Sequence, residues 1–247
     1  MARKLSTRKR PARELKPIRS RMKISNKVFD DQTMTVLHYF LSNKRITSLD
    51  FPIAQGKEAM VFRATTPTGY AAVKIFKYET ASFRKRMQYV QGDPRFKVPK
   101  GLRSAVRTWA RKEFANLSLC IRHGVRSPRP IAFKENVVIM EWLGVGGIPS
   151  ASLKDVWMDD PQRMLNELLE DVKKMREAGL VHADLSEYNI VVHENHPYLL
   201  DVGQSVLLSH EGSEGFFLKD VRNILKFFKR RGVKMTEEDA LNFVRGA

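Results

Sequence analysis

Three oxygen-bearing side chains between residues 181 and 203 stand at spacings that suit phosphoryl transfer. The segment V-H-A-D-L-S-E-Y-N carries Asp184 and Asn189, and the segment Y-L-L-D-V-G, after a predicted hairpin, carries Asp201. Phosphoryl transfer to a hydroxyl needs one carboxylate that accepts the hydroxyl proton and separate oxygen ligands that hold Mg²⁺ on the phosphates. We therefore predict that Asp184 is the base, that Asn189 and Asp201 hold the metal, and that His182 has a structural hydrogen-bonding role.

The order of the upstream motifs argues against a chance arrangement of turn-forming Asp and Asn residues. The pattern H-x-D-x-x-x-x-N followed by D-x-G matches the catalytic loop and metal motif of protein kinases. In those enzymes a strand lysine contacts the phosphates and pairs with a helix glutamate. The segments A-V-K-I-F-K and R-K-E-F supply Lys74 and Glu113 in these places. Taken singly, each of the two would more often be an exposed surface charge.

A loop that could approach the phosphates lies in I-A-Q-G-K-E-A-M-V-F at 53–62, between two predicted strands. Gly56 and Lys57 are its candidate ATP contacts, although the loop keeps only one of the three glycines of the kinase pattern. A Walker A loop is excluded, because Phe51 stands where that motif has glycine and Glu58 stands where it has serine or threonine.

The segment V-I-M-E-W-L-G at 138–144 leaves the last predicted strand of the first lobe and enters the connection between two lobes. We expect backbone groups of Glu141 and Leu143 to form hydrogen bonds with adenine there. An ordinary strand end fits the local sequence equally well, so this assignment depends on the other motifs.

Hydrophobic periodicity predicts the elements that must position these residues. Strands are expected at 48–53, 60–65, 70–76, 131–133 and 137–141, with a hairpin at 190–200. Helices are expected at 30–44, with Met34, Leu37, His38 and Leu41 on the apolar face, and at 103–122, 161–178, 215–231 and 236–244. The basic segment between Tyr78 and Leu102 is predicted to be a loop. The fold class is therefore α+β.

Length and composition limit the chain to one substantial core or two small lobes, because it has 247 residues and 43% hydrophobic content. We divide it into a basic arm at 1–27 that is disordered until bound, an N-terminal helix and N-lobe at 28–143 with a basic insertion at about 78–102, and a C-lobe at 144–247. The single cysteine and the lack of a long apolar run predict a cytoplasmic protein without a membrane partner.

The formal charge of +17 favours an anionic partner, and nucleic acid is the leading candidate. Residues 1–27 carry eleven Lys or Arg against one acid, Glu14. Further basic clusters are Arg84, Lys85 and Arg86; Arg103, Arg107, Arg111 and Lys112; and Lys226, Lys229, Arg230 and Arg231. The alternative is a basic surface that serves only solvation, but such a surface would have more evenly mixed charges.

Five motifs together resemble the RIO family of atypical serine/threonine kinases: G-K-E-A-M-V-F, A-V-K-I-F-K, R-T-W-A-R-K-E-F, H-A-D-L-S-E-Y-N and D-V-G-Q-S-V. The resemblance runs from about residue 48 to the end of the chain. The basic insertion and the phrase M-E-W-L-G-V-G-G-I-P are similar to the type-one branch. This resemblance implies a shortened two-lobed protein-kinase-like fold with an antiparallel-sheet N-lobe and a mainly helical C-lobe, and it implies ATP with Mg²⁺, or alternatively Mn²⁺, as cofactors.

The resemblance also implies a role in maturation of the small ribosomal subunit. The expected partners are the subunit precursor and its rRNA, whereas the protein substrate is not indicated. ATPase activity would pass through a phosphoryl group on Asp201, and Ser82 and Ser104 are candidate autophosphorylation sites. Two other functions remain open at this point: an RNA-binding assembly factor that uses nucleotide only as a conformational ligand, and a small-molecule kinase.

Four positions depart from the family pattern. Ala54 and Gln55 stand where serine and threonine usually precede the loop glycine, which removes a hydroxyl that could contact phosphate. Met60 replaces the usual asparagine, and Gly203 gives D-V-G-Q where the family has D-x-S-Q. These changes leave the proposed catalytic groups in place, but they put the affinity for nucleotide in question.

Overall fold

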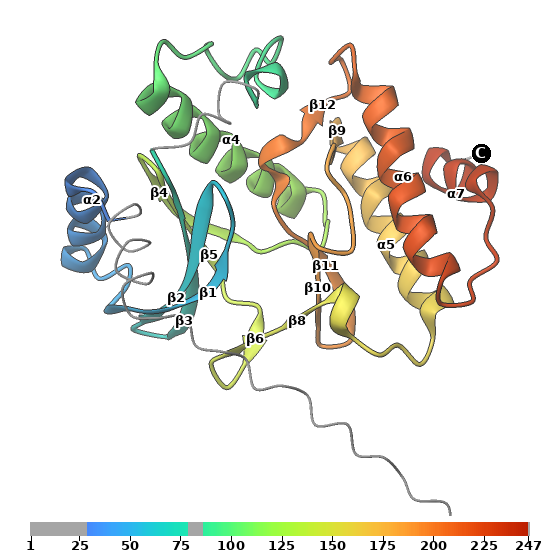
Figure 1. Ribbon diagram of the computed structural model, residues 1–247, viewed down its shortest axis with the longest axis horizontal. Helices are drawn as coiled ribbons and strands as arrows, with labels where there is room; N and C mark the ends of the chain where they lie inside the picture. Colours follow the sequence, from blue (N-terminus) through green and yellow to red (C-terminus); the bar gives the residue numbers. More distant parts are fainter. Residues whose placement is uncertain (1–28, 79–85, 247) are drawn as a thin grey trace, which may run out of the picture.

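The computed structural model describes residues 29–78 and 86–246. The predicted basic arm and the candidate phosphorylation site Ser82 lie outside these residues. Figure 1 shows the antiparallel sheet and α2 on one side of the molecule, α5, α6 and α7 on the other, and α4 between them. In the part of the chain that the structure describes, no helix combines the length and apolarity needed to cross a membrane.

The first lobe is built on a five-stranded antiparallel sheet in the order β1-β2-β3-β5-β4. Its strands are β1 (Ser48–Gln55), β2 (Ala59–Thr66), β3 (Gly69–Phe76), β4 (Pro130–Lys134) and β5 (Val137–Glu141). The five predicted strands are confirmed within two residues at each end. Pro52 is tolerated because β1 is an edge strand, whose outer edge pairs with no other strand and needs no backbone donor.

Two helices cover opposite faces of this sheet, and their boundaries follow from capping and periodicity. Helix α2 (Asp31–Ser42) begins at Asp30, whose carboxylate accepts a hydrogen bond from the Thr33 amide at 2.8 Å. Helix α4 (Leu102–Arg122) is inserted between β3 and β4 and reaches the second lobe. It buries Val106, Trp109, Ala110, Leu117 and Cys120.

The apolar face predicted for α2 is correct at Leu37 and wrong at Met34, His38 and Leu41. The helix buries Val36, Leu37 and Phe40, whereas Met34 and Leu41 are 52% and 39% exposed. The true face is rotated by about 100°, which is the angle of one residue on an α-helix. Both faces carry apolar residues, so periodicity alone could not decide between them, and packing against the sheet selects the one with the aromatic ring.

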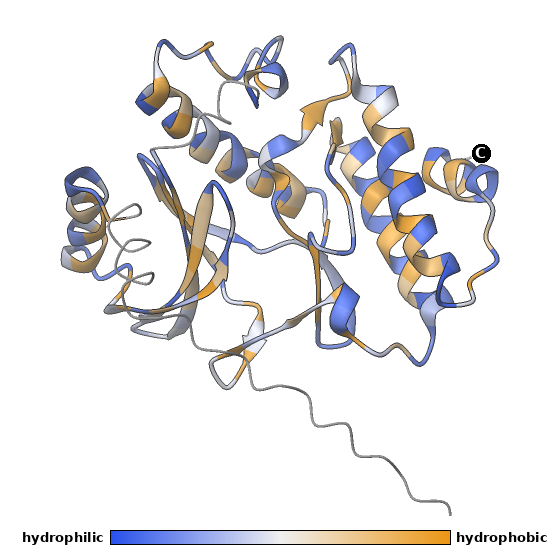
Figure 2. Ribbon diagram, in the orientation of Figure 1, coloured by the Kyte–Doolittle hydropathy of each residue, from blue (hydrophilic) through white to orange (hydrophobic). Residues whose placement is uncertain are grey.

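The second lobe is mainly helical, with α5 (Pro161–Glu177), α6 (Ser213–Lys229) and α7 (Glu237–Arg245) as its frame. Figure 2 shows apolar residues recurring between polar ones along α5 and α6, as expected for amphipathic helices. Short strands complete the lobe: β8 (Ala151–Ser152), β9 (Leu180–Val181), β10 (Ile190–His193), β11 (His196–Leu199) and β12 (Val206–Leu207). The predicted hairpin is β10–β11, and the three predicted helices are confirmed.

The described part of the basic insertion is not simply a loop. Residues 87–89 form a 3-10 turn, and Val90 and Phe96 are buried in the core that α4 shares with the second lobe. Asp93 is 6% exposed and forms an ion pair with Arg95 at 2.7 Å. Apolar anchors thus hold the end of the insertion against α4, which places Arg86 beside Glu58 and Trp109.

Candidate active site

Strand alternation explains how Lys74 enters the site. Val73 and Ile75 point to the side of the sheet that α2 covers, so Lys74 points to the α4 side. There its Nζ donates to Glu113 Oε1 and Oε2 at 2.7 and 2.8 Å and to Asp201 Oδ1 at 2.9 Å. One amino group therefore joins the first-lobe sheet, α4 and the segment that follows β11.

The three charges in this cluster shift each other's pKa values. Burial alone would lower the pKa of Lys74, but the carboxylates of Asp201 and Glu113 raise it above its ordinary value. Burial would raise the pKa of Asp201, and the Lys74 ammonium overcomes this and lowers it. Burial raises the pKa of Glu113. Lys74 therefore stays a cation and Asp201 an anion at neutral pH.

The structure places Asp184 within reach of Asn189 and of a residue that the sequence did not single out, Gln204. The Gln204 amide donates to Asp184 Oδ2 at 2.9 Å. The Asn189 amide nitrogen donates to the Asp184 carbonyl at 2.8 Å and faces Oδ2 at 3.4 Å. Its oxygen, Oδ1, is therefore the atom that remains for a cation. Burial, together with the negative charge of Asp201, raises the pKa of Asp184.

The loop that carries Asp184 is held by hydrogen bonds to a buried aspartate of α6. Asp220 is 2% exposed, and its carboxylate accepts hydrogen bonds from the amides of Ala183 at 2.7 Å and Leu185 at 2.8 Å. His182 Nε2 lies 3.0 Å from the Leu200 carbonyl. Sequence reasoning missed Asp220, although an acid on the apolar face of a predicted helix was a usable signal, because a buried carboxylate must have donors.

Gly56 and Lys57 lie at the β1–β2 turn. The Gly56 amide donates to the Ala59 carbonyl at 2.9 Å, and its own carbonyl accepts from Lys77 Nζ at 2.8 Å. Lys57 is exposed, and Glu58 forms an ion pair with Arg86. The turn is thus closed by its own backbone and tied to the basic insertion.

Arg86 is the third residue, after Gln204 and Asp220, whose place the sequence did not indicate. Its guanidinium lies 5.0 Å from the centroid of a Trp109 ring, besides pairing with Glu58. It is also one of the positive charges that lower the pKa of Asp201, after the contribution of Lys74. The sequence analysis grouped it with the basic clusters, and the structure places it beside Glu58 and Trp109, close enough to Asp201 to affect the pKa of that carboxyl.

Comparison with known proteins identifies the family. Residues 60–241 match the RIO domain family. The RIO-type serine/threonine-protein kinase Rio1 of Haloferax volcanii is 38% identical over 226 residues, which cover 91% of this chain and 78% of that protein. This chain belongs to the RIO family. The Rio1 kinase of Methanocaldococcus jannaschii is 36% identical with the same coverage, so the chain is an atypical serine/threonine kinase of the Rio1 type.

A solved relative confirms the fold of this RIO kinase. The crystal structure of the Rio2 kinase–ADP/Mg²⁺–phosphoaspartate complex from Chaetomium thermophilum matches with a TM-score of 0.65 and 25% identity. The match covers 83% of this chain and 63% of that chain. The shortened two-lobed protein-kinase-like fold, with an antiparallel first lobe and a mainly helical second lobe, is therefore confirmed.

The departures of this RIO kinase from the family pattern have local structural settings. Met60 is 5% exposed and packs on the α2 side of the sheet, away from Lys74. At Gly203, a Cβ would lie 2.9 Å from Trp109 Nε1, so this tryptophan occupies the space that a serine would need. Ala54 and Gln55 are exposed at the end of β1.

The adenine and phosphorylation candidates lie apart from the charged cluster. The Glu141 amide donates to the Arg129 carbonyl at 2.8 Å, and the Leu143 carbonyl accepts from the Ser150 amide at 2.9 Å. An adenine contact at these residues would therefore use the Glu141 carbonyl and the Leu143 amide. Ser104 is exposed in the first turn of α4, nine residues before Glu113 and so about 13 Å from it along the helix.

Proposed function

We propose that this RIO kinase transfers the γ-phosphoryl group of ATP, bound with Mg²⁺, to a serine or threonine hydroxyl or to water. The observation that carries the proposal is the contact of the buried Lys74 ammonium with Glu113, also buried, and with the partly exposed Asp201. A lysine held by two carboxylates is an oriented cation for phosphate oxygens, and such orientation is the main contribution of a protein to phosphoryl transfer. ADP and Mg²⁺ in the Rio2 relative support the choice of cofactors.

The residues present fit a metal ion that arrives with the nucleotide. Asp201 offers a carboxylate, and Asn189 offers the amide oxygen that its contact with Asp184 leaves over. Among the described residues, no group of three His, Cys, Asp or Glu side chains could hold a metal alone. Mg²⁺ is typically bound by one or two protein carboxylates with substrate phosphates and waters, and Mn²⁺ accepts the same oxygen ligands. The bound ion would neutralise phosphate charge.

We assign the base to Asp184. Its Oδ2 is engaged by Gln204, which orients the carboxylate and leaves Oδ1 to accept the proton of an attacking hydroxyl. Its raised pKa brings it closer to the working pH of a base. Glu113 keeps Lys74 extended toward the phosphates, and the Glu141 carbonyl with the Leu143 amide would bind adenine.

ATPase activity would use Asp201 as a nucleophile. Its carboxylate oxygen would form a bond to the γ-phosphorus while the bond to the β-phosphate oxygen breaks and ADP leaves. Water would then cleave the acyl phosphate to give inorganic phosphate and free Asp201. The phosphoaspartate in the Rio2 complex supports this route for the present chain.

We further propose that the enzyme acts in the cytoplasm on small-subunit precursors, with rRNA as one contact. The charge of +17 supports a polyanionic partner, since neutralised phosphates contribute much of the affinity of nucleic-acid complexes. The protein substrate is left open, and autophosphorylation would be sought at Ser104 and at Ser82 by phosphopeptide mapping.

The test is release of labelled phosphate from ATP with Mg²⁺ by the intact protein, Asp184→Ala and Asp201→Asn, with and without small ribosomal subunits. We expect turnover that the particle stimulates and that both variants lose. Normal hydrolysis by Asp201→Asn would refute the assigned chemistry. Tight nucleotide binding by the intact protein without turnover under either condition would instead support a nucleotide-gated binding factor.

A further inference from the structure

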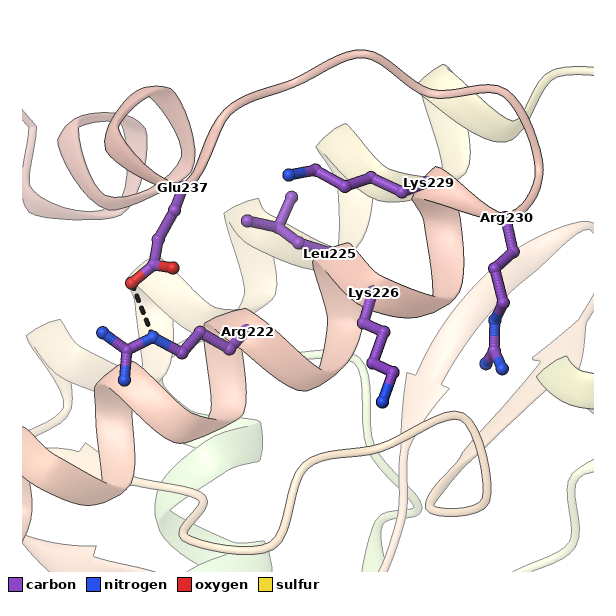
Figure 3. A pocket seen from close by; sticks show the side chains of 6 residues that line it. All are labelled: Arg222, Leu225, Lys226, Lys229, Arg230 and Glu237. Atoms are coloured by element: carbon purple, nitrogen blue, oxygen red, sulfur yellow. Dashed lines mark hydrogen bonds and ion pairs between the residues drawn. The ribbon is translucent and has the colours of Figure 1, made fainter.

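A basic groove lies in the second lobe, between α6 and α7, and shares no residue with the cluster of Lys74, Glu113 and Asp201. It has a volume of about 440 Å³. Figure 3 shows the side chains that line it: Arg222, Leu225, Lys226, Lys229, Arg230 and Glu237. We call it the α6–α7 groove. It contains four cations and one carboxylate, so it selects for negative charge.

The acidic groups nearby do not neutralise this groove. Glu237 pairs with Arg222 at 2.7 Å, and Arg230 pairs with Glu187 at 3.1 Å, but both arginine side chains stay 60% exposed. Within residues 29–78 and 86–246, no ion pair involves Lys226 or Lys229. Next to the groove, burial and then the charge of Arg230 lower the pKa of Arg231.

The spacing of the cations favours a ligand with repeated charges. Arg222 and Lys226 on the exposed side of α6 and Arg230 at its C-cap recur every four residues, while Val221 and Phe228 are buried on the other side. Each step of four residues rises about 6 Å along the helix. A single phosphate could contact only one or two of these groups. A row of phosphates along a chain could contact all of them.

We propose that the α6–α7 groove binds the sugar–phosphate backbone of RNA. Leu225, the apolar residue of the lining, is only 3% exposed, whereas a surface that inserts into lipid needs exposed apolar side chains. No aromatic ring lines the groove in the described structure, so base stacking contributes nothing and binding is independent of sequence. The inference rests on the proposed RNA partner and adds the surface that contacts it.

The solvated face of an amphipathic helix is the competing explanation for these cations. In that case the cations would affect RNA binding only through the net charge of the protein, and removing any other exposed cations would weaken binding equally. Arg45, three residues after α2, and Arg122, the last residue of α4, are exposed and do not line the groove. Their replacement therefore provides a control with the same change of charge.

The test measures binding of a fluorescein-labelled oligouridylate by anisotropy as KCl is raised. It compares the intact protein, the double variant Lys226→Glu with Lys229→Glu, and the control Arg45→Glu with Arg122→Glu. Loss of two phosphate contacts should make the salt slope about 1.4 shallower and weaken binding about 25-fold at about 0.1 M salt. The control should retain most of the affinity and the original slope. Basal ATP turnover should be equal in all three proteins.

Two results would overturn the proposal. An equal loss of RNA affinity in the Lys226→Glu, Lys229→Glu variant and in the control variant would show that only the net charge of the protein matters. Unchanged RNA affinity in the first of these, the groove variant, would place the RNA elsewhere. Phosphatidylserine vesicles and polyglutamate serve as rival probes: if the groove variant loses either of these and keeps RNA, the partner class is wrong. Absence of ATP turnover in the intact protein would refute the proposed catalysis without affecting the outcome for the groove.

Discussion

Lys112 provides the sharpest test of how the site is supported, because it is a fully buried lysine on the same helix as Glu113. Its side chain is 0% exposed, and its Nζ donates to the Gly203 carbonyl at 3.0 Å and to the Ser205 carbonyl. These carbonyls flank Gln204 and follow Asp201. Burial lowers the pKa of Lys112 to about 7. A neutral amine still has two protons to donate to the two carbonyls.

The sign of the pH effect follows from this lowered pKa. Between about 7 and the ordinary value of 10.5, the unfolded chain holds a proton that the folded Lys112 has lost. Its contribution to stability is therefore fully present above 10.5 and is lost as the pH falls through about 7. Over the interval from pH 7 to 9 the free energy of unfolding should rise by about 2 kcal/mol from this group.

The perturbation is Lys112→Met, which keeps the length of the side chain and removes the titrating group. Loss of the donor to buried carbonyls should cost about 1–3 kcal/mol at pH 7. The difference in free energy of unfolding between the intact protein and the variant should then be about 2 kcal/mol larger at pH 9 than at pH 7. Turnover should fall about tenfold, because the segment that bears Asp201 and Gln204 loses a support.

The assay is urea unfolding of both proteins at several pH values between 7 and 9, together with steady-state ATP turnover. Groups that titrate in both proteins contribute equally to both free energies of unfolding, so their contributions cancel when one is subtracted from the other. Lys100→Met, at an exposed lysine just before α4, is the control and should run parallel to the intact protein. A gap between the intact protein and Lys112→Met that stays constant from pH 7 to 9 would refute the reasoning.

Three further changes test single contacts. Gln204→Ala should lower kcat about 10- to 100-fold and leave KM for ATP nearly unchanged in steady-state kinetics, because Asp184 loses its orienting donor. Gly203→Ala should lower the free energy of unfolding by about 1–3 kcal/mol, since the new Cβ lies 2.9 Å from Trp109 Nε1. Asp220→Ala should cost about 2–5 kcal/mol and most of the turnover, measured by chemical unfolding and phosphate release, because two buried amides lose their acceptor.

Matched variants make these outcomes specific. Gly215→Ala adds a Cβ with no atom within 4 Å, so it should not destabilise α6, and similar losses at both glycines would contradict the crowding argument at Gly203. Asp220→Asn keeps one acceptor oxygen and should recover part of the stability. For Gln204→Ala, an unchanged kcat with a raised KM would show that the amide serves nucleotide binding and not the base.

Periodicity predicted the fold well where one face of an element is clearly apolar. The strands around Lys74 alternate between two buried faces, and α4 repeats apolar residues at helical spacing, so both were placed correctly within a few residues. The α2 face was partly wrong because apolar residues occur on both sides of that helix. Which face of α2 is buried is decided by the position of the helix on the sheet, and this position depends on contacts between residues distant in sequence.

The parts of the site that the sequence did not reveal are polar groups whose burial depends on tertiary structure. Lys112 stands beside Arg111 in a basic segment and was grouped with surface charges, yet it is completely buried. Asp220 and Gln204 acquire their roles only when α6 and the segment after Asp201 meet the catalytic loop. The position of Asp220 on the apolar face of a predicted helix signals only that it is buried, and no local pattern names the partners of either residue, because these lie many residues away.

Helix α6 connects the catalytic loop with the α6–α7 groove, and the contacts limit what this connection can transmit. Asp220 binds two backbone amides of the loop from the buried side of α6, while Arg230, just beyond the helix, reaches the Glu187 carboxylate at 3.1 Å. RNA that attracts Arg230 would break this exposed ion pair, which by itself contributes little to stability. The Glu187 carbonyl would still accept from Ser152 at 3.1 Å. Groove occupancy would therefore change the charge beside the loop while Asp220 keeps its backbone in place, so RNA should modulate turnover and not switch it.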